Sequence, residues 1–277
     1  MTITRFAPAK LNLALHVTDR RENGYHDLDS LVVFADFGDQ LRFEPADDLR
    51  LTVDGPLAFG VPTDDSNLVI KAARLFGGDN GALIELTKRL PHAAGIGGGS
   101  SDAAATLTGL AALWGADLPS AKAVLELGAD VPVCMEAKPA RMRGIGEKLD
   151  PLPPLPALSV VMVNPRVEVP TGKVFKGLSQ LNNPPMSDPD WHDFESFIHW
   201  LGQQRNDLEA PARAIAAEIA DVIEVLAAQP DCALARMSGS GATCFGVFEE
   251  AASADHAAAQ IALSHGNWWV QKADLLR

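Results

Sequence analysis

Residues 91–104 constrain the fold more than any other stretch of this chain, because they join a glycine loop to the start of a helix. They read Pro-His-Ala-Ala-Gly-Ile-Gly-Gly-Gly-Ser-Ser-Asp-Ala-Ala. Leu107 and Leu110 follow at helical spacing, which predicts a helix that Ser100 or Ser101 caps. Such a loop directs several backbone N–H groups toward the helix N-terminus. It therefore predicts an anion site, with phosphate as the favoured anion.

The residues that follow the glycines narrow the type of phosphate loop. A Walker A loop is excluded, since no Gly-Lys-Ser or Gly-Lys-Thr follows them. A dinucleotide-binding fingerprint fits poorly, since Ser100 stands where the third glycine of G-x-G-x-x-G belongs. A flexible glycine turn without a ligand stays open as the alternative, because glycine is the usual residue of strained turns.

Length and charge limit the remaining possibilities. The 277 residues suffice for two compact domains or one large one. The net charge of −13 argues against a nucleic-acid partner. No apolar run approaches the length of a signal peptide or a membrane span, so we expect no membrane partner. The 3 cysteines fit no metal motif, and we expect free thiols in a reducing cytoplasm.

Residues 11–17 alternate between apolar and mostly polar side chains, which predicts a strand. Lys10 and Asn12 share the face opposite the leucine stripe. A lysine beside an asparagine suggests that this face looks into a functional site. A solvated strand face is the alternative.

Residues 151–156, Pro-Leu-Pro-Pro-Leu-Pro, mark the clearest boundary. Their prolines cannot continue a helix or a central strand. We therefore expect an N-terminal domain over residues 1–152, which carries the glycine-rich loop, and a C-terminal domain over residues 153–277.

Further elements are expected on both sides of this boundary. A helix over 120–127 ends before Asp130, which stands where the N-cap of another helix would stand. In the second half, a helix is expected over 209–228, and residues 233–248 indicate two strands around a Ser-Gly-Ser-Gly turn. The helix over 209–228 has an expected buried stripe of Ile215, Ile219, Val222 and Leu226.

Several separated segments together resemble the GHMP kinases, a family of small-molecule kinases. The matching segments are Ala-Pro-Ala-Lys-Leu-Asn-Leu at 7–13, Asn-Gly-Tyr-His at 23–26, the glycine loop at 95–104, Leu-Gly-Ala-Asp-Val-Pro at 127–132, Gly-Ile-Gly-Glu at 144–147, Asn-Asp-Leu-Glu at 206–209 and Met-Ser-Gly-Ser-Gly-Ala at 237–242. The resemblance implies an α+β, two-domain GHMP kinase fold. Its N-terminal domain would be like domain 2 of ribosomal protein S5, and its C-terminal domain like an α/β plait.

The resemblance also implies an activity. The triple glycine with Ser-Ser-Asp, and the early Gly-Tyr-His, point to the branch whose small-molecule substrate carries a cytidine diphosphate. ATP with Mg²⁺ would phosphorylate the C2 hydroxyl of a methylerythritol in the non-mevalonate isoprenoid pathway. We expect a monomer or homodimer. The alternatives are another GHMP kinase, of the homoserine or mevalonate type, and a non-catalytic nucleotide-binding regulator.

The catalytic and ATP-binding residues follow from matching the family motifs onto this sequence. The resemblance implies that Asp130 is the general base and that Lys10 stabilises charge on the transferred group. Helix capping is the alternative for Asp130, and a solvated strand end is the alternative for Lys10. Ser101 is a candidate Mg²⁺ contact, and no other metal ligand is assigned. The implied ATP-binding residues are Lys88, Pro91, Gly95, Gly97, Gly98, Gly99, Ser100 and Ser101.

The substrate residues are assigned in the same way. Tyr25 would stack on the cytosine ring and His26 would bond its edge. Phe175 would form a second aromatic wall, with core packing as its alternative. The remaining candidates are Asn12 and Thr171 for hydroxyls or the diphosphate, and Gly239 and Gly241 in a second glycine turn that is otherwise a tight hairpin.

Overall fold

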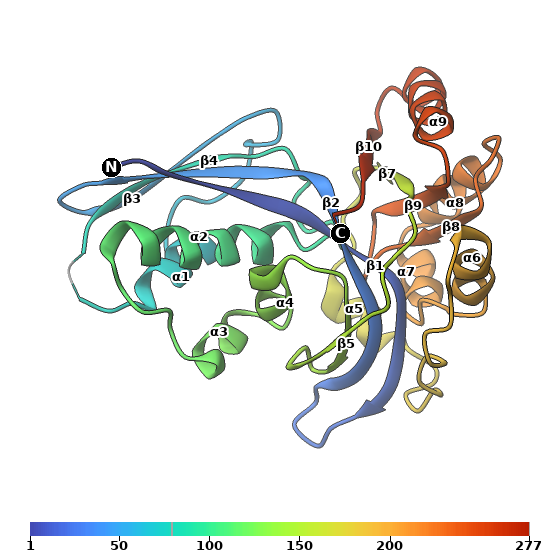
Figure 1. Cartoon of the computed structure of the whole chain (residues 1–277), viewed down its shortest axis with the longest axis horizontal. Coiled ribbons are helices and arrows are strands. Elements are labelled where there is room, and N and C mark those ends of the chain that lie inside the picture. Colours follow the sequence, from blue (N-terminus) through green and yellow to red (C-terminus); the bar gives the residue numbers. More distant parts are fainter. Residues whose placement is uncertain (79, 277) are drawn as a thin grey trace. The chain divides into compact units, whose positions relative to one another are not determined.

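The structure is a computed structural model, and it describes residues 1–78 and 80–276. The chain divides into two compact units (Figure 1). The first unit comprises residues 1–10, 37–92 and 97–137, and the second comprises residues 11–36, 93–96 and 138–277. The units thus alternate along the chain, whereas the sequence predicts a single cut after residue 152. That single cut stays a prediction.

Two long strands pass from one unit into the other. Strand β1 covers Ile3–Arg20 and β2 covers His26–Pro45, and the two pair with each other. Both faces of β1 are buried around Lys10, Asn12 and His16, which are 1–3% exposed. The solvated strand face considered for this segment is therefore wrong.

The first unit packs helices against a small sheet (Figure 1). Strand β4 (Ala82–Thr87) pairs antiparallel with the end of β2 and parallel with β3 (Leu49–Asp54). Helices α1 (Leu68–Arg74) and α2 (Gly98–Trp114) supply the other side of a core that includes Phe43, Ile84 and Leu110. Two short helices, α3 (Ala121–Leu127) and α4 (Val131–Glu136), complete this unit.

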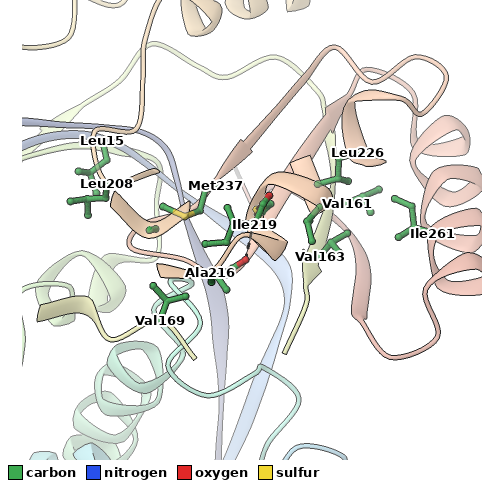
Figure 2. Close-up of a cluster of buried hydrophobic side chains, with 14 of the residues drawn as sticks. Leu15, Val161, Val163, Val169, Leu208, Ala216, Ile219, Leu226, Met237 and Ile261 are labelled. Atoms are coloured by element: carbon green, nitrogen blue, oxygen red, sulfur yellow. Dashed lines mark hydrogen bonds between the residues drawn. The ribbon is translucent and has the colours of Figure 1, made fainter. Parts of the chain in front are cut away.

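The second unit contains an antiparallel sheet in the order β10-β7-β9-β8. Its strands are β7 (Ser159–Asn164), β8 (Leu234–Met237), β9 (Cys244–Phe248) and β10 (Trp269–Asp274). Helices α8 (Glu218–Ala227) and α9 (Ala251–Ser264) contribute to the same core, which Figure 2 shows around Val161, Ile219 and Ile261. The other elements of this unit are β5 (Ala140–Gly144), β6 (Lys148–Pro151), α5 (Thr171–Lys176), α6 (Phe194–Gly202) and α7 (Glu209–Ile215).

The mixture of helices and sheets agrees with the predicted α+β class, but one helix differs from its prediction. The single helix expected over 209–228 is two helices, because Ala216 takes an extended backbone conformation (φ −136°, ψ 101°) and ends α7. Ile215 is consequently 41% exposed, while Ile219, Val222 and Leu226 are buried as expected. Among the described residues, no helix has the length and apolar character needed to cross a membrane.

Candidate active site

The glycine loop opens α2 without a side-chain cap. Gly97 is the N-cap residue, and its φ of +64° is a conformation that glycine adopts at little cost. The first intrahelical bond runs from Ser101 N–H to Gly97 O, at 2.8 Å. The N–H groups of Gly98, Gly99 and Ser100 precede that bond and belong to the donors that a helix leaves free for an anion. The prediction that Ser100 or Ser101 caps this helix is therefore wrong.

Lys10 and Asp130 form an ion pair in the first unit. Lys10 Nζ donates to Asp130 Oδ2 at 2.9 Å, and the two side chains are 4% and 31% exposed. A Cβ atom added to Gly97 would lie 2.9 Å from Lys10 Cβ, so the lysine side chain passes directly against the glycine loop. The reading of Lys10 as a solvated lysine is wrong, and the pair lies beside the predicted phosphate site.

The surroundings of Asp130 show whether its side chain caps helix α4. Asp130 occupies the N-cap position of α4, as the sequence suggests, with Pro132 in the first turn. Within the described part of the chain its side chain makes no capping hydrogen bond. The carboxylate is bound by Lys10 instead and keeps an exposed portion that a further group can reach.

Lys88 lies in a second, fully enclosed ionic cluster of the first unit. Lys88 Nζ donates to Asp39 Oδ2 and, at 2.8 Å, to Asp102 Oδ2. The side chains are 3%, 0% and 5% exposed for Lys88, Asp39 and Asp102. Asp39 Oδ1 also accepts the N–H groups of Arg89 and Leu90, at 2.6 and 2.9 Å. The ammonium expected to face ATP is therefore engaged by two carboxylates.

Burial and charge act in opposite directions on this cluster. Burial alone lowers the pKa of Lys88, but the carboxylates of Asp102 and Asp39 raise it above the ordinary lysine value. Burial raises the pKa of Asp102 to about 7, against the opposing effect of the Lys88 charge. The cluster thus holds one lysine firmly charged between two carboxylates of unequal environment.

Two oxygen atoms near the start of α2 lack partners. Ser101 Oγ and Asp102 Oδ1 are buried and have no hydrogen-bond partner among the described residues. Buried polar groups are normally satisfied, so the Ser101 hydroxyl marks a place where a ligand or ion is expected, whereas the Asp102 carboxylate belongs to the enclosed Lys88 cluster. Residues 1–78 and 80–276 contain no group of three or more His, Cys, Asp or Glu side chains arranged to hold a metal. Of the other predicted loop residues, Pro91 and Ser100 are half-buried and Gly99 is exposed.

The second glycine turn contacts residues 93–96 within the second unit. Ser238 Oγ donates to Gly95 O at 2.9 Å and accepts the Asn12 N–H at 3.1 Å. Thr243 N–H donates to Ala94 O at 3.1 Å. A Cβ at Gly239 would lie 2.8 Å from Gly95 O, and one at Gly95 would lie 2.5 Å from Ser238 O. The turn is therefore more than an isolated hairpin, because it holds the first part of the glycine loop.

The side chains of Asn12 and Thr171 also lie in the second unit. Asn12 Nδ2 donates to Ser30 Oγ at 2.7 Å, while Asn12 Oδ1 is buried and has no partner in the described part of the chain. Thr171 Oγ1 and Ser240 Oγ share a hydrogen bond of 2.8 Å, beside Gly241. The asparagine oxygen is thus an unsatisfied acceptor, as a substrate-binding group would be.

Two of the predicted cytidine residues, His26 and Phe175, form an aromatic group in the second unit. His26 stacks on Phe175, with ring centroids 4.9 Å apart and an interplanar angle of 28°. Tyr25 is 59% exposed. Burial, followed by the charge of Arg20, lowers the pKa of His26, which favours a neutral imidazole. Phe175 also packs against the core of this unit, as its alternative role predicts, and its role as an aromatic wall for cytidine stays a prediction.

Some residues of these sites were not identified from the sequence. Asp39 was missed, because an acidic residue just before the strand-like residues 41–44 gives no sign of its distant partners. Asn206 lies in a segment used for the family match but had no role assigned. Its Nδ2 donates to Met237 O and Gly239 O, both at 2.8 Å, and so holds the second glycine turn.

Comparison with known proteins gives matches in both halves of the chain. The family model "GHMP kinases N terminal domain" matches residues 67–139, and "GHMP kinases C terminal" matches residues 180–266. A 4-diphosphocytidyl-2-C-methyl-D-erythritol kinase from Cereibacter sphaeroides (strain ATCC 17025 / ATH 2.4.3) is 56% identical over 271 residues, 97% of each chain. The kinase of the same name from Jannaschia sp. (strain CCS1) is 54% identical over 276 residues, which are 100% of this chain and 98% of that protein.

A solved structure extends the match to the fold. The crystal structure of a 4-(cytidine 5'-diphospho)-2C-methyl-D-erythritol kinase is 35% identical, covers 99% of both chains and has a TM-score of 0.79. The predicted two-domain fold is confirmed by this agreement over nearly the whole length. The chain therefore belongs to the GHMP kinase family of small-molecule kinases, in the branch of these cytidine-diphosphate relatives.

Proposed function

We propose that this protein transfers the γ-phosphoryl group of ATP to the C2 hydroxyl of 4-diphosphocytidyl-2-C-methyl-D-erythritol, giving the 2-phosphate and ADP. The observation that carries this proposal is the Lys10–Asp130 pair, 2.9 Å apart and packed against Gly97 of the glycine loop. Relatives at 54–56% identity carry the name of this activity over nearly their full length, which supports the choice of acceptor.

Lys10 and Asp130 suit the acceptor side of the reaction. Asp130 has an exposed carboxylate portion that can accept the proton of an approaching hydroxyl. The buried ammonium of Lys10 orients that carboxylate and supplies positive charge where the transferred group becomes more negative. Phosphoryl transfer depends mainly on positioning and charge neutralisation, and this pair can provide both.

The loop suits the ATP side. The N–H groups of Gly98, Gly99 and Ser100 are the donors for the phosphates. The buried Ser101 Oγ, which has no hydrogen-bond partner in the part of the chain that the structure describes, fits a hydroxyl that would help to hold Mg²⁺, whose remaining ligands would come from phosphates and water. Mg²⁺ would neutralise phosphate charge during transfer.

The aromatic group of the second unit suits the cytidine. Tyr25 presents an exposed ring on which a base can stack, an interaction of about 1–3 kcal/mol per base. His26, neutral and braced by Phe175, has one donor and one acceptor nitrogen for the cytosine edge. Asn12 Oδ1 needs a donor, and a substrate hydroxyl would supply one.

The compartment and assembly state are also proposals. The free cysteines Cys134, Cys232 and Cys244 fit a reducing cytoplasm. We propose a monomer or homodimer.

The test is an acceptor panel with the purified protein and Mg·ATP. We expect the cytidyl methylerythritol to be phosphorylated and homoserine and mevalonate to be poor acceptors. Turnover of homoserine or mevalonate without turnover of the cytidyl compound would contradict the proposal. ATP binding with no turnover of any acceptor would instead favour the regulator.

The cytidine site has its own test. Tyr25→Ala should raise the KM for the cytidyl substrate by about 10-fold, the loss expected for one stacking contact, while the KM for ATP changes little. An equal rise in both KM values would remove Tyr25 from the cytidine site.

A further inference from the structure

The Lys88 cluster has no part in the chemistry proposed above, yet it is costly to build. Three ionisable side chains are withdrawn almost completely from water, and burying each charge costs several kcal/mol before its partners compensate. Hydrophobic side chains of similar volume would often give equal stability. Stability alone therefore does not account for this cluster.

The position of the cluster suggests what it does. Asp39 lies in β2, Lys88 directly follows β4, and Asp102 lies near the start of α2. The lysine thus ties two strands to the N-terminal part of the loop helix. Asp39 adds hydrogen bonds from the backbone of Arg89 and Leu90, which fix the segment that leads into the glycine loop.

The cluster also lies directly against the loop. A Cβ atom added to Gly98 would be 3.3 Å from Lys88 Nζ, so the ammonium lies immediately beside the first helical residue of the loop. Gly98 also carries one of the N–H groups proposed to bind phosphate. A shift of the lysine or of Asp102 would therefore move these donors.

We propose that Lys88, held between Asp39 and Asp102, is a positioning residue that fixes the start of α2 so that the N–H groups of Gly98, Gly99 and Ser100 converge on the ATP phosphates. This inference rests on the proposed use of the loop for ATP. Lys88 acts through the backbone and does not contact ATP, because both of its carboxylate partners are buried with it and its own side chain is 3% exposed.

Removing Asp102 separates positioning from direct contact. If Lys88 bound ATP directly, Asp102→Ala would free the ammonium and remove a negative charge, and ATP would bind more tightly. If Lys88 positions the loop, the same substitution releases the start of α2 and ATP binds more weakly despite the favourable change in charge. We expect the dissociation constant of Mg·AMP-PNP, measured by calorimetry, to rise about 10- to 100-fold, as for other small misplacements of a binding group.

A second variant keeps the test decisive if Asp102→Ala does not fold. Asp102→Asn keeps an oxygen that can accept from Lys88, so we expect it to weaken AMP-PNP binding only about 3-fold and to restore most of the affinity lost in Asp102→Ala. Unchanged or tighter binding in Asp102→Asn, or in Asp102→Ala, overturns the inference. If Asp102→Ala does not fold, the asparagine variant decides alone.

Two further readouts distinguish positioning from general destabilisation. The KM for the cytidyl substrate should stay within about two-fold of the wild-type value in both variants, because the proposed role of Asp102 concerns ATP binding and not the acceptor. Asp48→Asn is the matched control, since Asp48 is 62% exposed and pairs with Arg50 on the surface of the same unit. A rise in both KM values, or an equal effect in Asp48→Asn, would contradict a positioning role.

The inference and the proposed function fail in different ways. If the wild-type protein binds AMP-PNP but does not phosphorylate the cytidyl substrate, the acceptor assignment is wrong, and the AMP-PNP constants still decide the role of Lys88. If the wild-type protein phosphorylates the substrate and Asp102→Ala binds AMP-PNP normally, only the inference is wrong. If the wild-type protein does not bind AMP-PNP, both are wrong.

Discussion

Two lysines of the first unit lie against consecutive glycines of the same loop, yet their surroundings differ. The side chains of Lys10 and Lys88 are 4% and 3% exposed, and they approach Gly97 and Gly98 respectively. Among residues 1–78 and 80–276, Lys10 has one carboxylate partner, which is 31% exposed, whereas Lys88 has two carboxylate partners that are at most 5% exposed. The exposure of the partner, and not the burial of the lysine, separates a group that can react from one that can only hold the structure.

Electrostatics explains why this difference matters. A carboxylate that water reaches can also be reached by a substrate hydroxyl and can exchange a proton with it. An enclosed pair interacts in a medium of lower effective dielectric constant and resists any exchange of partners. The Lys10–Asp130 pair is therefore suited to catalysis, and the Lys88 cluster is suited to positioning.

The largest expected effect concerns the exposed carboxylate. Asp130→Ala removes the proposed base, and kcat should fall on the order of 10²–10⁴-fold, the usual contribution of a positioned base. Steady-state kinetics with saturating ATP and cytidyl substrate measures it. The control is Asp48→Asn, which should behave as wild type. Turnover at the wild-type rate in Asp130→Ala would remove this residue from catalysis.

We expect Lys88 to contribute more than Lys10 to the free energy of unfolding, although the proposed catalytic role belongs to the Lys10–Asp130 pair. Lys88→Met leaves two buried carboxylates without their cation and should lower the free energy of unfolding by about 3–5 kcal/mol. Lys10→Met leaves a carboxylate that water can solvate, so we expect a smaller loss of about 1–2 kcal/mol. Urea unfolding measures both, with the exposed Lys122→Met as control. A larger loss in Lys10→Met than in Lys88→Met would reverse the comparison.

The two glycines should report on different kinetic constants. Gly97→Ala places a methyl group 2.9 Å from Lys10 Cβ at a positive φ, so we expect kcat to fall about 10- to 100-fold. Gly98→Ala places a methyl group 3.3 Å from the Lys88 ammonium, which two carboxylates hold, so it should mainly weaken ATP binding, by about 10-fold. Kinetics at varied ATP separates the two. If Gly97→Ala and Gly98→Ala change the same kinetic constant, Lys10 and Lys88 do not have separate roles in catalysis and in ATP binding.

The smallest effect is a dependence of stability on pH. Burial opposes the charge of Lys88, but Asp102 and Asp39 raise its pKa above 10.5. A lysine whose pKa is raised by folding stabilises fully below its unfolded pKa and loses that contribution as the pH rises through the folded value. Lys88→Arg keeps a positive charge over this whole pH range, so the Tm difference between wild type and Lys88→Arg should stay constant from about pH 8 to about pH 10 and change only above. A difference that changes already between pH 8 and pH 10 would contradict the raised pKa.

Much of the site could be predicted because its signals are local. The glycine loop and its helix follow from consecutive residues, and the family motifs indicate Lys10 and Asp130. The structure adds that this pair is joined at 2.9 Å and that Asp130 does not cap its helix. The proposed roles of these residues stay predictions.

The Lys88 cluster was not predictable in the same way. Its members are Asp39, Lys88 and Asp102, which are separated by 49 and 14 positions in the sequence. Only the pairing of strands and the packing of α2 brings them together, and no local pattern encodes such a contact. The break at Ala216 has a similar origin, since nearby residues such as Ile215 and Ile219 fit one continuous helical stripe.

The most direct measurement is a comparison of Asp130→Ala and Asp102→Ala in one set of assays, with the dissociation constant of Mg·AMP-PNP and the kcat at saturating substrates determined for each. We expect Asp130→Ala to lose kcat and retain AMP-PNP affinity, and Asp102→Ala to lose AMP-PNP affinity and retain most of its kcat. If both variants change the same constant, the division between a reacting pair and a positioning cluster is wrong.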